Sequence, residues 1–444
     1  MKVLIVNCYD EKQYNRGIFN GNKTDVPYIC NKLKLIGIEI RVVKLVFHQA
    51  DNYDDIINQI KVTEPDYICY SIAEIDSLTM LKPEFYLDYV KRLSKRIRQL
   101  KISVQPKQIG FGTGFSIMPE LICNFLELDY GIVDDGEVNI VNLINYFLHN
   151  QSFSNLPQII TQDQSRLIKS KLERAERVQE VYTDGDILYP TDNITINGYC
   201  THECIYCPKK KCFNNKLYES NIENLINYVE RIQPNEFDID YRINDCAINN
   251  SKETSIKFFR GLIDKKIIRR WEAFLHPSNI NKEYILLLKE SGCVNINLRV
   301  DAVETTILQS LKRPFSREDI DTALKIIIDG GIPFKVHITL GAPKDNDYLI
   351  EKTLEYLESK KISNVQFNIG IRIFPDTVLH EISILEGVLR RDESLLYPRF
   401  YFSNDVTNRG VNIIKRFKQR NPNWDFIDID KLGKLIRERD SWLF

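Results

Sequence analysis

The chain contains 444 residues, of which 43% are hydrophobic, and its formal net charge is −1. This length exceeds one typical hydrophobic core, so we expect two or three domains. The near-neutral charge excludes a general electrostatic attraction to nucleic acid or anionic lipid, and no apolar run reaches the ~18 residues of a membrane span. Ten cysteines without a regular framework suit a reducing compartment, so we expect a cytoplasmic protein.

The first 150 residues alternate short apolar, β-branched runs with segments of helical pattern. We predict strands at 2–9, 38–46, 65–72, 108–112 and 130–133. We predict helices near 27–36, 53–61, 84–101, 118–126 and 134–148. Alternation of this kind predicts an α/β domain with a doubly wound, Rossmann-like parallel sheet, which we assign to residues 1–150.

Glycines follow two of these strands. Gly112 and Gly114 come after the fourth predicted strand, and Gly136 comes after the fifth. Ligands of doubly wound sheets bind beyond the carboxyl ends of the strands, where glycine lets the backbone approach a bulky ligand closely. Tight turns that bind nothing would use the same glycines. Both interpretations stay open on the sequence alone.

A second strand–helix series follows a polar, charged stretch at 151–188, which is typical of a linker with one exposed helix. In the segment 189–382 the predicted strands alternate polar and apolar residues, at 193–197, 237–244, 294–301, 334–340 and 365–373. We predict the intervening helices at 220–231, 252–264, 279–291, 317–329 and 346–359. Residues 383–444 form a small C-terminal extension.

Period-two alternation places the polar residues of each strand on one face. That face would carry Asn244, Arg299, Asp301 and His337, whereas a barrel interior used only for packing would be aliphatic. We therefore predict a partial (β/α)6 TIM-like barrel with helices outside and polar groups inside. An antiparallel sheet with one wet face is the alternative, but it would need hairpins in place of the helical connections.

The loop after the first strand of this series holds Cys200, Cys204 and Cys207 in the spacing C-x3-C-x2-C. Three thiolates can hold three irons of a 4Fe–4S cluster and leave the fourth iron open, as a catalytic metal site does. A zinc knuckle that also uses Cys212, and thiols that bind no metal, are the alternatives. A zinc site would need a second ligand pair, and the next cysteine, Cys246, lies in a predicted strand.

This spacing, with the aromatic Tyr206 before the last cysteine, resembles the signature of the radical S-adenosylmethionine (SAM) enzymes. Further stretches follow in the order of that family, at 291–302, 308–313, 329–332, 341–343 and 372–379. The resemblance implies that the open iron binds SAM, which the reduced cluster cleaves to a 5′-deoxyadenosyl radical.

The same resemblance implies roles for barrel residues. Tyr206, Asn244 and Asp301 would contact the cofactor, and Arg299 and His337 would be catalytic, although each could instead form an ion pair or support a neighbour inside the barrel. The chain departs from the family pattern at three places. Tyr199 replaces a common Gly, Asp301 replaces Glu, and Asn244 with the next residue stands in place of a Gly-Gly-Glu-Pro turn.

Residues 1–150 resemble the cobalamin-binding domain that precedes many radical SAM enzymes. The resemblance rests on Gly112, Gly114 and the acidic turn around Gly136, and it implies that these glycines contact cobalamin. The Asp-x-His-x-x-Gly motif that supplies an axial histidine is absent, and His48 lies elsewhere. Either cobalamin binds without a histidine ligand, or the domain binds none.

The combined resemblance implies a methyltransferase that acts on an unactivated carbon, or on a phosphinate phosphorus, of a small-molecule, natural-product or peptide substrate. Its cofactors would be the 4Fe–4S cluster, SAM and cobalamin, and its electron donor a flavodoxin or ferredoxin. Radical rearrangement, cyclisation or oxidation without cobalamin is one alternative, and a non-enzymatic metal-binding module is another. An electron-transfer protein would prefer four cysteines per cluster. We expect no nucleic acid partner and no membrane span.

Overall fold

The computed structural model describes residues 1–9, 26–47, 52–133, 136–149, 159–161, 193–197, 200–208, 221–234, 236, 238–426 and 428–437. The chain divides into two compact units. Unit 1 comprises residues 1–77, 85–189 and 211–216, and unit 2 comprises residues 78–84, 190–210 and 217–444. The boundaries expected after residues 150, 188 and 382 stay predictions.

Unit 1 contains a six-stranded sheet in the order β2-β1-β3-β4-β5-β6. Its strands are β1 (Lys2–Tyr9), β2 (Glu39–Val46), β3 (Tyr67–Ile72), β4 (Lys107–Phe111), β5 (Tyr130–Ile132) and β6 (Ile159–Thr161). Neighbours pair in parallel, except that β6 runs antiparallel to β5. The five strands expected from the sequence are confirmed, and β6 lies in the segment expected to be a linker.

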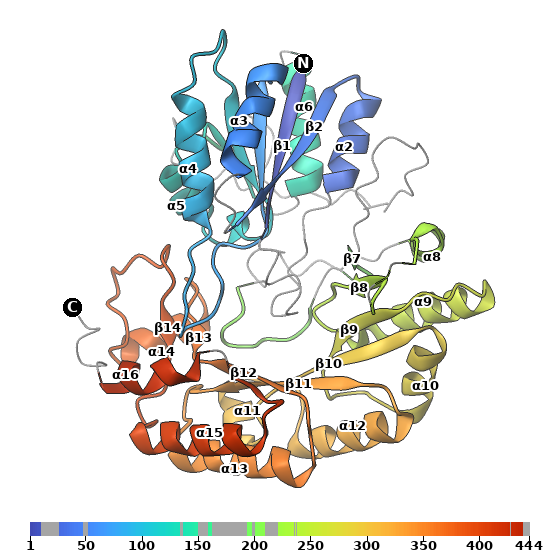
Figure 1. Ribbon diagram of the computed structural model, residues 1–444, viewed down its shortest axis with the longest axis vertical. Coiled ribbons are helices and arrows are strands. Elements are labelled where there is room, and N and C mark those ends of the chain that lie inside the picture. Colours follow the sequence, from blue (N-terminus) through green and yellow to red (C-terminus); the bar gives the residue numbers. More distant parts are fainter. Residues whose placement is uncertain are drawn as a thin grey trace. The chain divides into compact units, whose positions relative to one another are not determined.

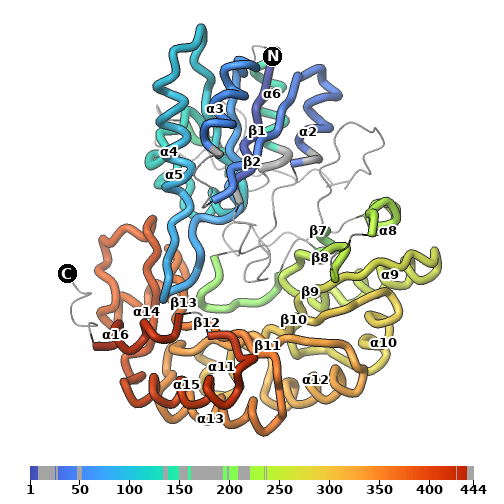
Figure 2. Tube along the Cα trace, viewed as in Figure 1, coloured from blue at the N-terminus to red at the C-terminus, as the bar shows by residue number. Residues whose placement is uncertain are grey.

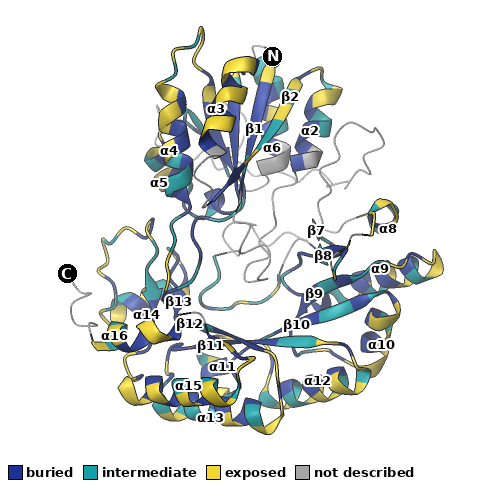
Figure 3. Cartoon of the chain, in the orientation of Figure 1, coloured by how far each residue is buried: buried dark blue, intermediate teal, exposed yellow. Residues whose placement is uncertain are grey.

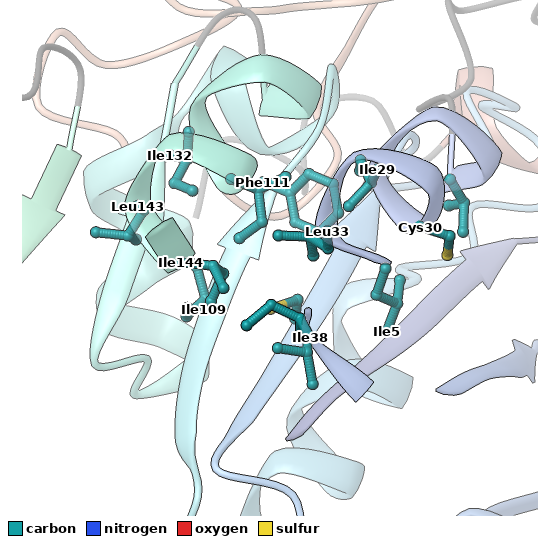
Figure 4. Packing of buried hydrophobic residues seen from close by; sticks show 14 of the residues in the cluster. Ile5, Ile29, Cys30, Leu33, Ile38, Ile109, Phe111, Ile132, Leu143 and Ile144 are labelled. Carbon is teal, nitrogen blue, oxygen red and sulfur yellow. The ribbon is translucent and has the colours of Figure 1, made fainter. Parts of the chain in front are cut away.

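Helices cover both faces of this sheet (Figure 1). They are α2 (Val26–Leu35), α3 (Asn52–Thr63), α4 (Leu87–Arg98), α5 (Pro119–Leu126) and α6 (Gly136–Leu148), with a 3₁₀ turn, η1, at Phe115–Ile117. One layer is made by α2 and α6, which pack against each other, and the other by α3, α4 and α5. Ile5 and Ile109 of the sheet are buried against Ile29, Leu33 and Ile144 of the first layer (Figure 4). Burying these aliphatic side chains is the main force that holds the layer to the sheet.

Unit 2 contains a seven-stranded sheet in the order β15-β12-β11-β10-β9-β8-β7. Its strands are β7 (Asn193–Ile194), β8 (Tyr241–Ile243), β9 (Trp271–Leu275), β10 (Cys293–Asp301), β11 (Phe334–Leu340), β12 (Val365–Ile369) and β15 (Asp425–Phe426). Every pair is parallel, so the antiparallel alternative is wrong. The chain visits β7 to β12 in sequence order (Figure 2). The C-terminal β15 pairs with β12 at the far edge.

Helices lie along the outside of this sheet (Figure 1). They are α8 (Ile222–Arg231), α9 (Lys252–Asp264), α10 (Lys282–Glu290), α11 (Thr305–Ser310), α12 (Arg317–Gly330), α13 (Asp347–Ser359), α14 (Val378–Leu385), α15 (Asn408–Arg420) and α16 (Leu432–Arg437). Short 3₁₀ turns, η3 and η4, occupy Ile248–Ser251 and Ile429–Lys431, and β13 (Ile371–Arg372) pairs antiparallel with β14 (Phe400–Tyr401). No helix of the described ranges is long and apolar enough to cross a bilayer.

Local sequence signals define the ends of these helices. In α12, Ser316 and Asp319 form a reciprocal capping box at the N-terminus. The C-terminal cap is Gly331, whose φ of 67° lies in the left-handed region that favours glycine. The predicted helix at 317–329 therefore begins and ends where its caps indicate.

The strands of unit 2 have one apolar and one polar face. In β10, Ile296, Leu298 and Val300 are fully buried on the side of the helices. The alternating residues Asn297 and Arg299 lie on the opposite, concave side, as the period of two predicted. In Figure 3 the outer helices are coloured as buried along the side toward the sheet and as exposed along the other side. The predicted doubly wound sheet and partial barrel are both confirmed.

Candidate functional site

The three-cysteine loop follows β7 and is fastened at its centre. Ile205 is buried, its backbone N–H donates to the Leu311 carbonyl at 3.3 Å, and its carbonyl accepts from the N–H of Leu379 at 3.0 Å. Ile205 is thus held on both sides. Cys200, Cys204 and Cys207 are all half-exposed. The structure therefore presents all three thiols of the predicted set on one anchored loop.

A buried arginine contacts this loop. The Nη1 of Arg313 donates a hydrogen bond to Cys204 Sγ at 2.8 Å, and its Nε lies 3.3 Å from Asp301 Oδ2. The Tyr206 hydroxyl donates to the same carboxylate oxygen at 2.5 Å. Burial alone would lower the pKa of the Arg313 guanidinium, but Asp301 and Tyr206 raise it above its ordinary value. A charged donor beside the sulfur is what a thiolate ligand requires.

The position of Asp301 depends on a local irregularity of β10. The pairing register with β11 shifts between Arg299 and Asp301, and Asp301 adopts a φ of 60°. Asp tolerates this left-handed conformation better than most side chains do. Bulges of this kind re-aim side chains beside functional sites, and here the carboxylate is aimed at Tyr206 of the cysteine loop.

Cys246 lies beside Cys200. It occupies the turn after β8, whereas the sequence predicted that it would lie within a strand. A hydrogen bond between the two thiols, and then burial, raises the pKa of Cys200 above its ordinary range. Loss of this proton is therefore part of any metal binding at Cys200. Among the described residues, no three His, Cys, Asp or Glu groups converge as tightly as the ligands of one metal ion.

The turn after β8 also holds the strand that leads into the loop. Asn244 is buried and its backbone N–H donates to the Ile194 carbonyl at 2.7 Å. The Asp245 carboxylate accepts from the backbone N–H groups of Ile196 and Asn197, both at 2.9 Å. Burial raises the pKa of Asp245 well above its ordinary value. The Asn244-Asp245 turn therefore fixes the entry of the chain into the cysteine loop.

Two imidazoles lie beside the same loop. The rings of His202 and His276 are 4.3 Å apart. His276 Nε2 lies 2.7 Å from Asn250 Oδ1 and its Nδ1 lies 2.7 Å from the Ser278 hydroxyl. Burial is the main reason that the pKa falls to about 4 for His202 and about 3 for His276. Both rings are therefore neutral at pH 7 and add no positive charge beside the loop.

The concave face below the loop carries the other predicted residues. His337 on β11 is paired in register with Arg299 on β10, so the two expected catalytic residues are neighbours. His337 Nε2 lies 3.2 Å from Asn297 Oδ1. The guanidinium carbon of Arg299 lies 4.0 Å from the ring centroid of Phe274. Tyr206 and Asp301 are in direct contact, whereas Asn244 bonds to Ile194 of β7.

In unit 1 the sheet changes direction between β1 and β3, since β1 lies between β2 and β3. Ligands of doubly wound sheets bind at such a point. Gly112 follows β4 with a φ of 112°, and Thr113 donates its hydroxyl to the Ala73 carbonyl at 3.1 Å. A Cβ on Gly114 would lie 2.8 Å from the backbone of Ala73, so close packing inside the protein already requires this glycine. Gly136 is the first residue of α6.

Comparison with known proteins extends this description. No family model matches the chain. A tryptophan 2-C-methyltransferase of Streptomyces laurentii is 18% identical over 421 residues, which cover 78% of this chain and 69% of the relative. The solved structure of the radical SAM methyltransferase TsrM from Kitasatospora setae, with cobalamin and a 4Fe–4S cluster bound, is 15% identical with a TM-score of 0.80. That similarity covers 100% of this chain and 98% of TsrM.

The chain has the fold of the cobalamin-dependent radical SAM enzymes. A second such structure is that of OxsB with aqua-cobalamin and SAM bound, which is 11% identical with a TM-score of 0.67. That similarity covers 100% of this chain and 71% of the OxsB chain. The order of a doubly wound sheet followed by a partial barrel is thus shared from end to end. The family resemblance drawn from the sequence is confirmed at the level of this fold.

Sequence reasoning missed the residues of this radical SAM fold that act on the cysteine loop from a distance. Arg313, Cys246 and His276 were not expected to be site residues. Arg313 is separated from Cys204 by 109 positions, so no local pattern joins them. His276 follows β9, which was not predicted. The signal that could have found Arg313 is its place at the end of the stretch 308–313, which the family resemblance singles out.

Proposed function

We propose that the chain is a cobalamin-dependent radical SAM methyltransferase that methylates an unactivated carbon of a small molecule. One observation carries the proposal: a three-cysteine loop, with a buried guanidinium bonded to one of its sulfurs, stands at the head of a partial barrel in a chain that has the TsrM fold from end to end. TsrM has been solved with tryptophan bound, and the similar Streptomyces protein is named for tryptophan methylation. An aromatic amino acid is therefore the first class of substrate to test.

The cluster would be held by Cys200, Cys204 and Cys207. When bound, the cluster supplies the electron that cleaves SAM, and cobalamin carries the methyl group. The role of the chain is to prepare the ligands and to hold them. Arg313 stabilises the Cys204 thiolate with a charged hydrogen bond, and Asp301 keeps Arg313 in place from its other side. Both contacts are buried, so water does not weaken them.

The remaining site residues belong to the same proposal. Tyr206, Asn244 and Asp301 are proposed to shape the SAM site, and Arg299 and His337 are proposed to contact the substrate. For cobalamin, the proposed contacts are Gly112, Gly114 and Gly136 at the carboxyl edge of the unit 1 sheet.

An electron donor of the flavodoxin or ferredoxin class and a cytoplasmic location complete the proposal. A cluster with an exposed iron needs a low-potential reductant and a reducing environment.

The test is anaerobic reconstitution with iron, sulfide and hydroxocobalamin, followed by desalting and measurement of iron and cobalamin per chain. We expect about four irons and one cobalamin, and we expect SAM to be consumed when a reductant and an aromatic amino acid are added. The variant Cys207→Ala should lose SAM consumption, whereas Cys123→Ala, which removes a thiol of unit 1, should retain it. Zinc bound in place of iron, or intact SAM under all these conditions, would refute the proposal.

A radical rearrangement or oxidation without cobalamin is the second candidate. It is favoured by Gly114, whose close approach to the Ala73 backbone explains the glycine without a ligand. The same reconstitution separates the two candidates. About four irons with no retained cobalamin would favour the second.

A further inference from the structure

The concave face of β10 and β11 carries two cations, Arg299 and Lys335. Both side chains are half-buried. The register pairs Arg299 with His337 and Asn297 with Lys335, so the two cations are diagonal neighbours on adjacent strands. Two cations in one half-buried wall repel each other unless an anion lies between them.

Other charges of this face are already neutralised. Arg242 on β8 forms an ion pair with Glu272 on β9. The second oxygen of Glu272 accepts hydrogen bonds from the amides of Asn295, at 2.9 Å, and Asn297, at 3.3 Å. Both carboxylate oxygens of Glu272 therefore already have partners, and Glu272 does not neutralise a further cation.

Arg299 is held in a different way. Its guanidinium lies flat over Phe274, 4.0 Å from the ring centroid, and the aromatic ring supports the cation without neutralising it. Among the described residues, neither Arg299 nor Lys335 forms an ion pair. The planar fork of Arg299 remains available for a carboxylate or phosphate, which it can bind with two parallel hydrogen bonds.

His337 lies between the two cations and adds no charge. Burial, and then Arg299 and Lys335, lower the pKa of His337 to about 3, so the ring is neutral at pH 7. Its Nε2 donates to Asn297 Oδ1 at 3.2 Å, which leaves Nδ1 as an acceptor. The wall thus offers two positive charges and one neutral acceptor to whatever occupies the barrel.

These groups lie below the cysteine loop along β10. Asp301 is level with the loop, because it bonds to Tyr206. Arg299 is two residues earlier and Lys335 is level with Asn297, four residues earlier, so they lie roughly 7 and 13 Å deeper at the rise of a β-strand. The carboxylate of SAM would bind the open iron at the level of the loop. An anion held at the depth of Arg299 and Lys335 would therefore belong to a different molecule.

We propose that the small molecule which reacts in this barrel carries an oxyanion group, a carboxylate or a phosphate, that pairs with Arg299 and Lys335. The proposal rests on the proposed function only in assuming that a molecule reacts here. It names the substrate class by its charge, and it assigns Arg299 the role of orienting that charge away from the cysteine loop.

The first test uses inorganic phosphate as the probe and metal-free protein, so that it does not depend on any cofactor. Binding is measured anaerobically by titration calorimetry. We expect Arg299→Gln to weaken phosphate binding at least about tenfold and Arg299→Lys to weaken it less, because lysine keeps the charge but loses the fork. Lys335→Gln should also weaken it. Lys325→Gln, which removes an exposed lysine from the outer helix α12, is the matched control and should change nothing.

The second test asks whether the anion site belongs to SAM. In reconstituted protein, phosphate should still bind at saturating SAM, and Arg299→Gln should leave SAM affinity within about twofold. Competition between phosphate and SAM, or loss of SAM binding in Arg299→Gln, would assign the cation to the carboxylate of SAM and overturn the proposal. Wild-type protein that binds no phosphate would overturn it as well.

The two proposals can fail separately. Protein that assembles no cluster and binds no SAM would refute the proposed function, while the phosphate titration of the metal-free protein would still decide the anion site. If Arg299→Gln loses the buried tryptophan fluorescence of unit 2, Arg299→Lys and Lys335→Gln decide the question in its place.

Discussion

Breaking the ion pair between Arg313 and Asp301 is expected to cost unit 2 several kcal/mol of stability. The two side chains are only 6% and 13% exposed, and their closest atoms are 3.3 Å apart. Removing one partner of a buried pair costs about 3–5 kcal/mol, because the other charge stays in a low-dielectric setting. We expect Arg313→Met to cost this much, since methionine keeps much of the aliphatic stem and loses the charge.

A double-mutant cycle isolates the pair. Asp301→Asn should also destabilise the protein, because Arg313 and Tyr206 then lose the carboxylate that they share. The double variant should cost less than the sum of the single variants by about 1–3 kcal/mol, because the second change removes a charge that the first left unpaired. The exposed pair of Lys352 and Glu355 provides the control, and Lys352→Met should cost less than about 1 kcal/mol.

The assay is anaerobic urea unfolding of the metal-free protein, followed by tryptophan fluorescence. It reports on unit 2, because Trp271 and Trp424 are fully buried there and all three tryptophans of the chain come after residue 270. An unchanged slope of the free energy of unfolding against urea would show that the variants alter stability and leave the unfolded ensemble alone. A cost for Arg313→Met no larger than that of Lys352→Met, or additive single costs, would refute the reasoning.

Three further predictions concern other parts of the chain. Gly114→Ala should destabilise unit 1 by about 1–3 kcal/mol, measured by thermal circular dichroism, because the new methyl would lie 2.8 Å from the Ala73 backbone. The pKa of His337 is lowered to about 3, so below pH ~6.5 the unfolded chain gains a proton at this residue and the native state does not. The free energy of unfolding therefore falls as the pH falls. His337→Gln should reduce the slope of that free energy against pH by about 1.4 kcal/mol per pH unit between pH 6 and 4. Cys204→Ala should retain fewer than about four irons after reconstitution, while Cys123→Ala should bind a full cluster.

Each of these has a clear contrary outcome. A Cβ added to Gly433 would have no neighbouring atom closer than 3.5 Å, so Gly433→Ala should not destabilise the protein. Equal losses of stability in Gly114→Ala and Gly433→Ala would contradict the packing argument. An unchanged pH slope in His337→Gln would mean that this ring is not kept neutral by burial. A full iron content in Cys204→Ala would remove that thiol from the ligand set.

The strands β1, β3 and β4 of unit 1 could be predicted because they are buried on both faces. Parallel strands of this kind appear in a sequence as continuous apolar runs, and Tyr67–Ile72 is such a run. In unit 2 the alternation of β10 and β11 was equally clear. β9 was missed because its inward set combines Glu272 with the apolar Phe274, which breaks the polar–apolar alternation. β15 has two residues and no local signal of its own.

The site was predictable where its residues share one stretch of sequence. The three cysteines and Tyr206 lie within eight positions, and their spacing carries chemical meaning. Arg313 and Cys246 reach the same place through the fold, from separate strand–helix connections. Long-range contacts of this kind follow from topology, and a single sequence contains no period or spacing that reports them.

Because residues 78–84 belong to unit 2, they cannot complete their folding early in synthesis on the ribosome. Met80 is buried, and its sulfur packs on Gly370 so closely that a Cβ on this glycine would lie 2.3 Å from it. Met80 therefore cannot pack until the ribosome has added Gly370. Synthesis of the intervening chain takes roughly 15–60 s at bacterial-type rates. During that interval Met80 lacks the surface against which it packs in the folded protein. Cutting the gene at a single point between the codons of Met80 and Gly370 would leave the N-terminal product with Met80 unpacked permanently.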